Sequence, residues 1–261
     1  MRHIGIDGRH INPHPARVPQ QNKGDATMKE MSRKVVLAAV VLALAPMGQA
    51  KTNADEDWQF WTHERANIKI TDKVVATVGA MYRFGDDMSE LWYQHYDAGV
   101  IFKTTKWLSI MASYRLKMVD AGISGKFKGD DWINIHNPSL NFIFTHKLGK
   151  VKLKNNCRFA YWNYDSEFGR DDLMYYRNIF MVAGPAWTKA KISPYIQEDF
   201  FFNTNIGEVD RNRLSTGLMF GKWKAVSPKV YLMWQAYNGT GLESSDNKDN
   251  YILGLDFKFK F

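Results

Sequence analysis

The stretch Tyr251-Ile-Leu-Gly-Leu-Asp-Phe-Lys-Phe-Lys-Phe261 decides the fold that we expect for this chain. Side chains of a β-strand point alternately to opposite faces. One face of this segment carries only apolar and aromatic side chains, namely Tyr251, Leu253, Leu255, Phe257, Phe259 and Phe261. The other face is mostly polar. The segment therefore reads as a strand with one side suited to hydrocarbon and the other suited to water.

The terminal phenylalanine of this strand indicates where the protein is located in the cell. Bacterial outer-membrane barrels typically end on such a strand, and this tail resembles their assembly signal. We therefore expect the cell outer membrane as the location. The expected partners are outer-membrane lipid, lipopolysaccharide and the barrel-assembly machinery.

The opposite end of the sequence carries a predicted export signal. A basic segment over 28–34 precedes an uncharged apolar run over 35–46, and Gly48 and Ala50 supply the small residues of a cleavage site. The run is shorter than the roughly 20 apolar residues of a membrane-spanning helix. We expect residues 1–27 to be a disordered or non-native leader and 28–50 to be a signal peptide. Residues 51–261 would then form a single barrel.

Charge and cysteine content exclude some functions. The formal net charge is +8, but residues 1–50 hold seven Lys and Arg and three Asp and Glu, which leaves +4 for residues 51–261. That charge is scattered through strand-like segments, so we expect no nucleic-acid partner. A lone cysteine, Cys157, excludes an intramolecular disulfide and is expected to be a small buried hydrophobe.

Period-two alternation dominates the chain after Ala50 and predicts an all-β, up-and-down antiparallel barrel. Eleven segments show it: 57–70, 74–84, 90–103, 107–118, 132–147, 151–163, 173–187, 192–203, 210–223, 229–237 and 250–261. Short connections alternate with longer ones rich in Asp, Gly, Asn and Ser, as in membrane barrels. A soluble periplasmic β-protein is the alternative fold.

The expected number of strands is twelve, with ten as the alternative. Bacterial single-chain barrels have even strand numbers. Either the segment 57–70 divides into two strands, or one of the eleven segments lies outside the barrel. Tryptophans next to connections, at 107, 132, 187 and 223, fit an interfacial girdle.

The face opposite the apolar one supplies the candidate site. If the apolar face meets lipid, the other face lines the lumen, and basic residues outnumber acidic ones on it. The lumen-facing candidates are Arg83, His95, Asp97, Arg115, Lys117, Arg158, Arg177, Arg211 and Arg213. Either Glu198 or Asp199 joins this face, and the segment 192–203 leaves the choice open.

Several segments, in order, resemble a family of Gram-negative envelope proteins known only as a domain of unknown function and thought to be outer-membrane barrels. They are Phe60-Trp-Thr62, Tyr93-Gln-His-Tyr-Asp-Ala-Gly99, Trp107-Leu-Ser109, Tyr176-Arg-Asn178, Pro194-Tyr195 with Glu198, Arg211-Asn-Arg213 and Tyr231-Leu-Met-Trp-Gln235. The resemblance covers essentially all of 51–261. It implies no catalytic residue, because the family has no established activity. The architecture and basic lumen are also similar to those of twelve-stranded porins for acidic oligosaccharides.

Three functions remain open from the sequence. A cationic lumen predicts a small anion-leaning channel or porin with small anionic solutes as partners. A plugged lumen, whose charges satisfy one another, predicts a structural or adhesive barrel that acts through acidic loops such as 168–172 and 243–249. An outer-membrane lipid-modifying enzyme is the third possibility.

The enzyme alternative lacks a recognisable set of catalytic residues. His95 and Asp97 share a face, and His136 lies near Ser139, but the chain has no Gly-x-Ser-x-Gly motif. Searches for phosphate-binding and metal-binding motifs are also negative. We expect no metal and no cofactor.

Overall fold

The computed structural model describes residues 57–120, 132–165, 171–188, 191–221, 223, 225–237 and 249–261. The expected leader and signal peptide, and most of the two acidic loops, lie outside the described residues. The described strands are β1 (Asp57–Lys69), β2 (Val74–Gly85), β3 (Glu90–Lys103), β4 (Leu108–Asp120), β5 (Trp132–Leu148), β6 (Val151–Tyr164), β7 (Leu173–Ala183), β8 (Ser193–Asn203), β9 (Glu208–Met219), β10 (Val226–Tyr237) and β11 (Asn250–Lys260). Within these ranges no helix is long and apolar enough to cross a bilayer.

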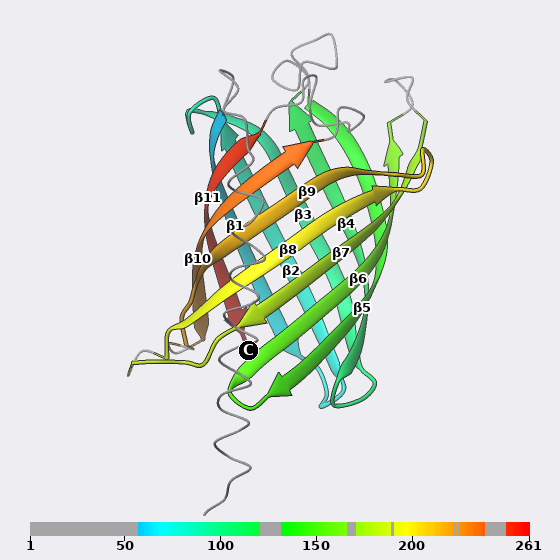
Figure 1. The fold of residues 1–261 in the computed structure, drawn as a ribbon. Coiled ribbons are helices and arrows are strands. Elements are labelled where there is room, and N and C mark those ends of the chain that lie inside the picture. The colour runs from blue at the N-terminus through cyan, green and yellow to red at the C-terminus, as the bar shows by residue number, and fades with distance from the viewer. Residues whose placement is uncertain are drawn as a thin grey trace, which may run out of the picture.

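The strands form one closed, mostly antiparallel barrel (Figure 1). Each strand pairs with its neighbours in sequence, and β1 also pairs with β11. The β1–β11 pair is parallel and runs from Asp57 opposite Asn250 to Asn67 opposite Lys260. Closure leaves the sheet without an unpaired edge, which would otherwise expose a row of backbone hydrogen-bonding groups.

The predicted number of strands is wrong, both as twelve and as ten, since the described strands number eleven. The segment 57–70 does not divide. Instead β1 is continuous, and nearly the same residues pair with β2 on one side and β11 on the other. Neither edge of β1 is left for another strand. Because strand direction alternates along the chain, an odd number makes the first and last strands parallel.

The predicted segments agree with the strands to within a few residues, apart from three boundaries. β7 ends at Ala183, before Gly184 and Pro185, where proline removes a backbone donor. β9 ends at Met219, four residues before the predicted end at 223, and β10 begins at Val226, three residues before the predicted start at 229.

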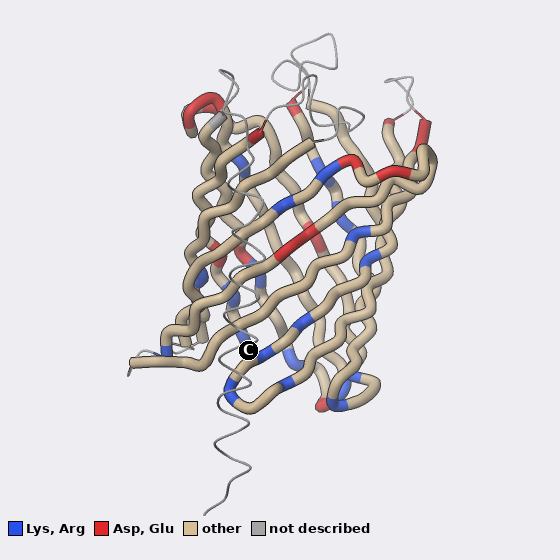
Figure 2. The backbone as a smooth tube through the Cα atoms, in the orientation of Figure 1, with Lys and Arg blue, Asp and Glu red and all other residues tan. Residues whose placement is uncertain are grey.

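The two ends of the barrel differ. The short connections, such as 70–73, 104–107 and 149–150, lie at the end where β11 finishes (Figure 1). The connections 86–89 and 204–207 lie at the opposite end, which we call the loop end. Figure 2 shows Asp and Glu concentrated near the loop end, with Lys and Arg along the strands and at the short-turn end.

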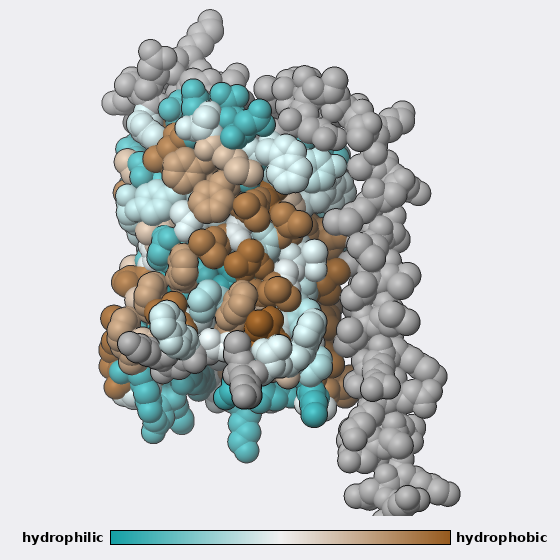
Figure 3. Space-filling model, turned by 90° about the vertical axis from the view of Figure 1, so that its left-hand side faces the viewer, coloured by the Kyte–Doolittle hydropathy of each residue, from teal (hydrophilic) through white to brown (hydrophobic). Residues whose placement is uncertain are grey.

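The outer face is largely apolar. Its exposed side chains include Val78, Val100, Phe102, Leu140, Phe144, Phe159, Phe180, Leu218, Leu232 and Leu253, and Figure 3 shows hydrophobic surface between hydrophilic ends. Trp107, Trp187 and Trp223 near connections are also exposed. Cys157 lies on this face and is only half-buried, contrary to expectation, with Asn178 and Tyr176 donating to its sulfur.

Inward side chains pack against one another in two apolar clusters. One apolar cluster lies toward the loop end and includes Trp92, Tyr93, Ile133, Trp162, Tyr175 and Phe201. A second includes Ala183, Tyr195 and Tyr231. Around the closure, large and small residues alternate across neighbouring strands in the row Trp61, Gly254, Tyr231, Gly217 and Tyr195. Such alternation lets rings fill a narrow barrel.

Candidate functional site

The candidate site is a small cavity inside the barrel, where seven basic side chains meet. Its volume is about 30 Å³, which exceeds the roughly 10–15 Å³ that one water molecule requires. Eight strands, β2 to β9, line it with Arg83, Tyr93, Arg115, Lys117, Asn137, Arg158, Ala160, Trp162, Tyr175, Arg177, Phe201, Arg211 and Arg213. Because every second residue of a strand points inward, one to three positions per strand build this wall.

Aromatic rings separate several of the basic groups. The guanidinium carbon of Arg83 lies 3.9 Å from the ring centres of both Trp61 and Tyr93. The Nζ atom of Lys117 lies 3.0 Å from the ring centre of Trp162. A cation over a ring face gains about 0.5–2 kcal/mol. That gain offsets part of the cost of keeping these charges away from bulk water.

Three guanidinium groups surround the ring of Phe201. The guanidinium carbons of Arg177, Arg211 and Arg213 lie 4.6, 4.5 and 4.7 Å from its centre. The ring itself is buried. Phe201 therefore stands at the point where positive charge is densest, and its removal would open space there.

Asp199 on β8 supplies one counter-charge. Arg177 donates to both carboxylate oxygens, through Nε at 2.7 Å and through Nη2. Arg213 Nη1 lies 3.9 Å from Asp199 Oδ2. Asp199 is buried, whereas its neighbour Glu198 is exposed on the outer face. The structure thereby settles which of the two acidic residues faces inward.

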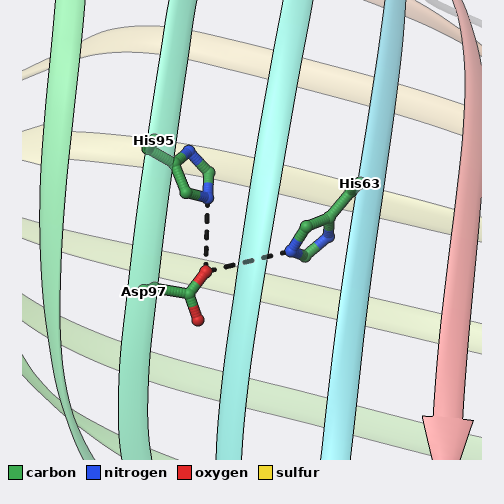
Figure 4. A group of neighbouring side chains, drawn as sticks. All are labelled: His63, His95 and Asp97. Carbon is green, nitrogen blue, oxygen red and sulfur yellow. Dashed lines mark ion pairs between the residues drawn. The ribbon is translucent and has the colours of Figure 1, made fainter.

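Asp97 on β3 is the centre of a second polar cluster (Figure 4). Arg65 Nη2 contacts its two carboxylate oxygens at 3.2 and 3.1 Å. Arg115 Nη2 lies 3.7 Å from Oδ1. The Nε2 atoms of His95 and His63 lie 3.3 and 3.9 Å from the same oxygen, and both rings point toward it.

Gly79 makes this cluster possible. It lies on β2, directly opposite Arg65 of β1 and Asp97 of β3. A Cβ atom at this position would lie 3.2 Å from Asp97 Oδ1 and 3.5 Å from Arg65 Nε. Glycine therefore leaves the gap through which side chains of β1 and β3 meet across the strand between them.

His63, His95 and Asp97 have the donor types of a two-histidine, one-carboxylate metal centre, with ligand atoms within 4.8 Å of one another. Arg65, however, already occupies both oxygens of Asp97. A divalent cation here would also add positive charge to a basic interior. The Tyr93 hydroxyl and His95 Nδ1 are 3.0 Å apart, so a neutral His95 can accept from Tyr93 while its Nε2 lies 3.3 Å from Asp97 Oδ1. The cluster fits a hydrogen-bond network better than a metal site.

Positive charge is in excess around the cavity. Among the described residues, three carboxylates lie in this part of the interior: Asp97, Asp199 and Asp210, the last accepting from Tyr175 at 2.5 Å. The cavity wall carries seven Arg and Lys side chains. Buried charges need partners of opposite sign. The wall is therefore suited to an anion.

A family model described as "Protein of unknown function (DUF2490)" matches residues 58–245. The chain belongs to the DUF2490 family. The matched residues include β1 from Trp58 onward, β2 to β10 and the whole cavity wall, while the closing strand β11 lies beyond them. No curated protein matches the chain.

Among solved structures, the chain is similar to "Anion-selective porin from Comamonas acidovorans". The alignment has 10% sequence identity and a TM-score of 0.35, and it covers 69% of this chain. The DUF2490 chain spans 55% of the length of that porin. At this TM-score the likeness supports neither a strand number nor a function.

The nine lumen-facing candidates of this DUF2490 chain occupy two adjoining places. Seven line the cavity: Arg83, Arg115, Lys117, Arg158, Arg177, Arg211 and Arg213. His95 and Asp97 lie in the neighbouring cluster, which Arg115 joins to the cavity. Seven of the nine are buried, and the side chains of Arg115 and Arg177 are 13% and 20% exposed. That they line a conducting lumen stays a prediction.

Four important residues of the site were missed in the sequence. Trp61, Arg65 and Phe201 occupy inward positions, and Gly79 provides the gap between two of them. Alternation alone could have found Arg65, which shares the face of His63. The contacts of Trp61 and Phe201 depend on cross-strand register, which the sequence does not reveal.

The serine and histidine considered for an enzyme do not meet. Ser139 bonds to Ser113 at 2.8 Å, whereas His136 contacts Tyr114 and Asp165. An odd separation along one strand places Ser139 and His136 on opposite faces. The structure therefore brings no serine and histidine of this pair within hydrogen-bonding distance.

Asp172, in the acidic connection between β6 and β7, is already engaged. Hydrogen bonds from the Tyr161 hydroxyl and from Asn163 Nδ2, at 3.0 Å, hold the pKa of its carboxyl below the ordinary value. Its oxygens are committed to neighbouring donors. This carboxylate is thus a weak candidate for a bridging divalent cation.

Proposed function

We propose that this protein is an outer-membrane β-barrel whose interior selects small anions. The observation that carries the proposal is the charge of the cavity wall, with seven Arg and Lys side chains from five strands. Rings of basic side chains favour anions in pores. Aromatic rings contact five of these cations inside the barrel, namely Arg83, Lys117, Arg177, Arg211 and Arg213, so the selective potential does not depend on surface charge alone.

Three features of the chain support a location in the outer membrane. The barrel is closed, and hydrocarbon tolerates only structures without unpaired backbone groups. The outer face is largely apolar, and residues 28–50 have the pattern of an export signal. Extraction only by detergent, together with heat-modifiable gel migration, would support this location. Release by salt or carbonate would contradict it.

The cavity leaves little room for an ion in this arrangement. A space of about 30 Å³ is too small for an ion with its water shell. Conduction by this barrel therefore requires wall side chains to move. We expect a low conductance with brief openings, in which an anion exchanges water for guanidinium groups.

Loss of two cavity charges is expected to weaken anion preference. In planar bilayers with a salt gradient, the reversal potential of the wild type should favour the anion. Arg115→Gln with Arg158→Gln should move it toward zero, because two of the seven cationic groups are gone. Asp97 keeps Arg65 as its partner, and Arg158 bonds to Asn137 and not to a carboxylate.

The control for that measurement is Lys73→Gln, which removes one charge from an exposed turn. Its reversal potential should stay near that of the wild type. Equal ion preference in the wild type and the double variant would contradict the role of the cavity wall. Cation preference in the wild type would contradict the function itself.

A structural barrel with a plugged interior is the second candidate. The small cavity and the two apolar clusters favour it. Absence of any current from correctly folded protein would decide for this candidate.

Truncation of Phe201 is expected to separate the two candidates further. Phe201→Ala removes the ring that three guanidinium groups surround. If the wild-type barrel conducts ions, the Phe201→Ala barrel should carry a several-fold larger current, with unchanged anion preference. Single-channel recordings measure this, with Phe180→Ala on the outer face as the control. A folded Phe201→Ala barrel without current would favour the plugged structural barrel.

A further inference from the structure

Three guanidinium groups of the cavity wall keep donors without acceptors. Arg115 Nε, Arg158 Nε and Arg213 Nη2 are buried and have no hydrogen-bond partner among the described residues. Two of these side chains are held elsewhere: Arg158 Nη2 donates to Asn137 at 2.9 Å, and Arg213 Nε donates to Gln235 at 2.5 Å. These groups are therefore fixed in place while some of their N–H groups still lack an acceptor.

These donors belong to charges that repel one another. Arg158 interacts unfavourably with Arg115 and Arg177, and Arg213 does so with Arg177. All four line the same cavity. A water molecule there could accept hydrogen bonds but could not reduce the repulsion. An anion would do both, since charge-assisted hydrogen bonds are stronger than neutral ones.

The size of the cavity restricts the anion. About 30 Å³ is roughly twice the space that one water molecule requires, so the cavity admits a small particle such as a monatomic ion and little more. Chloride and bromide are of that size, whereas phosphate, sulfate and carboxylate-bearing sugars are larger. The aromatic side chains in the wall, Tyr93, Trp162, Tyr175 and Phe201, also suit a weakly hydrated ion, because ring edges carry partial positive charge.

We propose that the cavity binds one dehydrated halide ion, chloride under ordinary conditions, between Arg115, Arg158, Arg177 and Arg213. This proposal rests on the proposed anion-selective interior, and it specifies the anion that binds there. Bound chloride would neutralise one positive charge and accept from N–H groups that the protein leaves unpaired. It would therefore stabilise the folded barrel as well as mark the anion pathway.

The test uses the folded full chain in detergent micelles, without a bilayer. Thermal unfolding is followed while sodium chloride or bromide replaces sodium gluconate at constant ionic strength. We expect a saturable rise in Tm with either halide, since a ligand that binds only the folded state stabilises it. Arg158→Gln should raise the half-saturating halide concentration about tenfold. Lys152→Gln, which removes an exposed charge of β6, should leave it unchanged.

A second measurement covers the case in which Arg158→Gln does not fold. Crystals of the wild type grown with bromide should show anomalous density inside the cavity. Density only at the barrel ends, or a Tm that rises without saturation, would overturn the site. Selective conduction without halide binding would refute the site and keep the proposed function. Halide binding without conduction would support the site and refute the proposed function.

Discussion

Replacing Gly254 with valine is expected to prevent the barrel from closing correctly. A Cβ atom at this position would lie 1.9 Å from Tyr231 Cζ and 2.2 Å from Cε2. The aromatic ring of β10 therefore rests on the bare backbone of β11, the closing strand. Overpacking a well-packed interior typically costs about 1–3 kcal/mol and occasionally more. The folded fraction, measured by heat-modifiable migration and urea unfolding, should fall sharply.

The control for this substitution restores the space. Tyr231→Ala in the Gly254→Val background should recover folded protein, because the clashing ring is gone. Tyr231→Ala alone should lower stability less than Gly254→Val does, since it leaves a cavity without preventing closure. A Gly254→Val barrel that folds and unfolds like the wild type would show that Tyr231 has another place to lie.

Neutralising Asp97 is expected to have the second large effect. Asp97→Asn removes the charge that Arg65 and Arg115 share, and it leaves those two cations in an already basic interior. Removing one partner of a buried ion pair costs about 3–5 kcal/mol. The free energy of unfolding in urea, measured on barrels reconstituted in lipid vesicles, should fall by that amount.

Two further variants make this test specific. Asp72→Asn breaks the exposed pair with Lys69 at 2.6 Å and should cause no resolvable change, because exposed ion pairs contribute little. Asp97→Asn combined with Arg65→Gln should recover part of the loss. If Asp97→Asn were as harmless as Asp72→Asn, the cluster around Asp97 would not contribute to stability.

Local patterns were enough to predict much of this fold. Alternation placed Arg115 and Lys117 on one face of a single strand and the apolar residues of that strand on the other, and the structure agrees. The final strand behaves in the same way, with Ile252 buried and Leu253 exposed. Such features depend only on neighbours in sequence, so a reader of the sequence can find them.

Features that depend on pairing between distant strands could not be predicted. The segment 57–70 looked long enough for two strands, and only its pairing with both β2 and β11 shows that it is one. The segment 192–203 has apolar side chains on both faces, so its alternation did not separate Glu198 from Asp199. Asp199 is opposite Arg213 of β9, and that cross-strand partner identifies its face.

The site shows the same division between local and distant information. Its basic character followed from counting charges on alternate positions. The small volume of its cavity did not, because the space left between side chains depends on how Arg83 fits between Trp61 and Tyr93 and on how Phe201 meets three guanidinium groups. Nor does the sequence indicate that Gly79 leaves room for Arg65 to reach Asp97.

The parallel pair of β1 and β11 has a consequence for protein engineering. Joining the ends of a domain and cutting it elsewhere succeeds when those ends lie close together. Here the beginning of β1 and the end of β11 lie at opposite ends of the barrel. With 11 residues in β11 and a rise of about 3.3 Å per residue, a linker joining them must span more than three nanometres, past either a filled interior or the apolar outer wall. Circular permutation with a short linker is therefore ruled out by topology, and new segments are better inserted at the connections of the loop end.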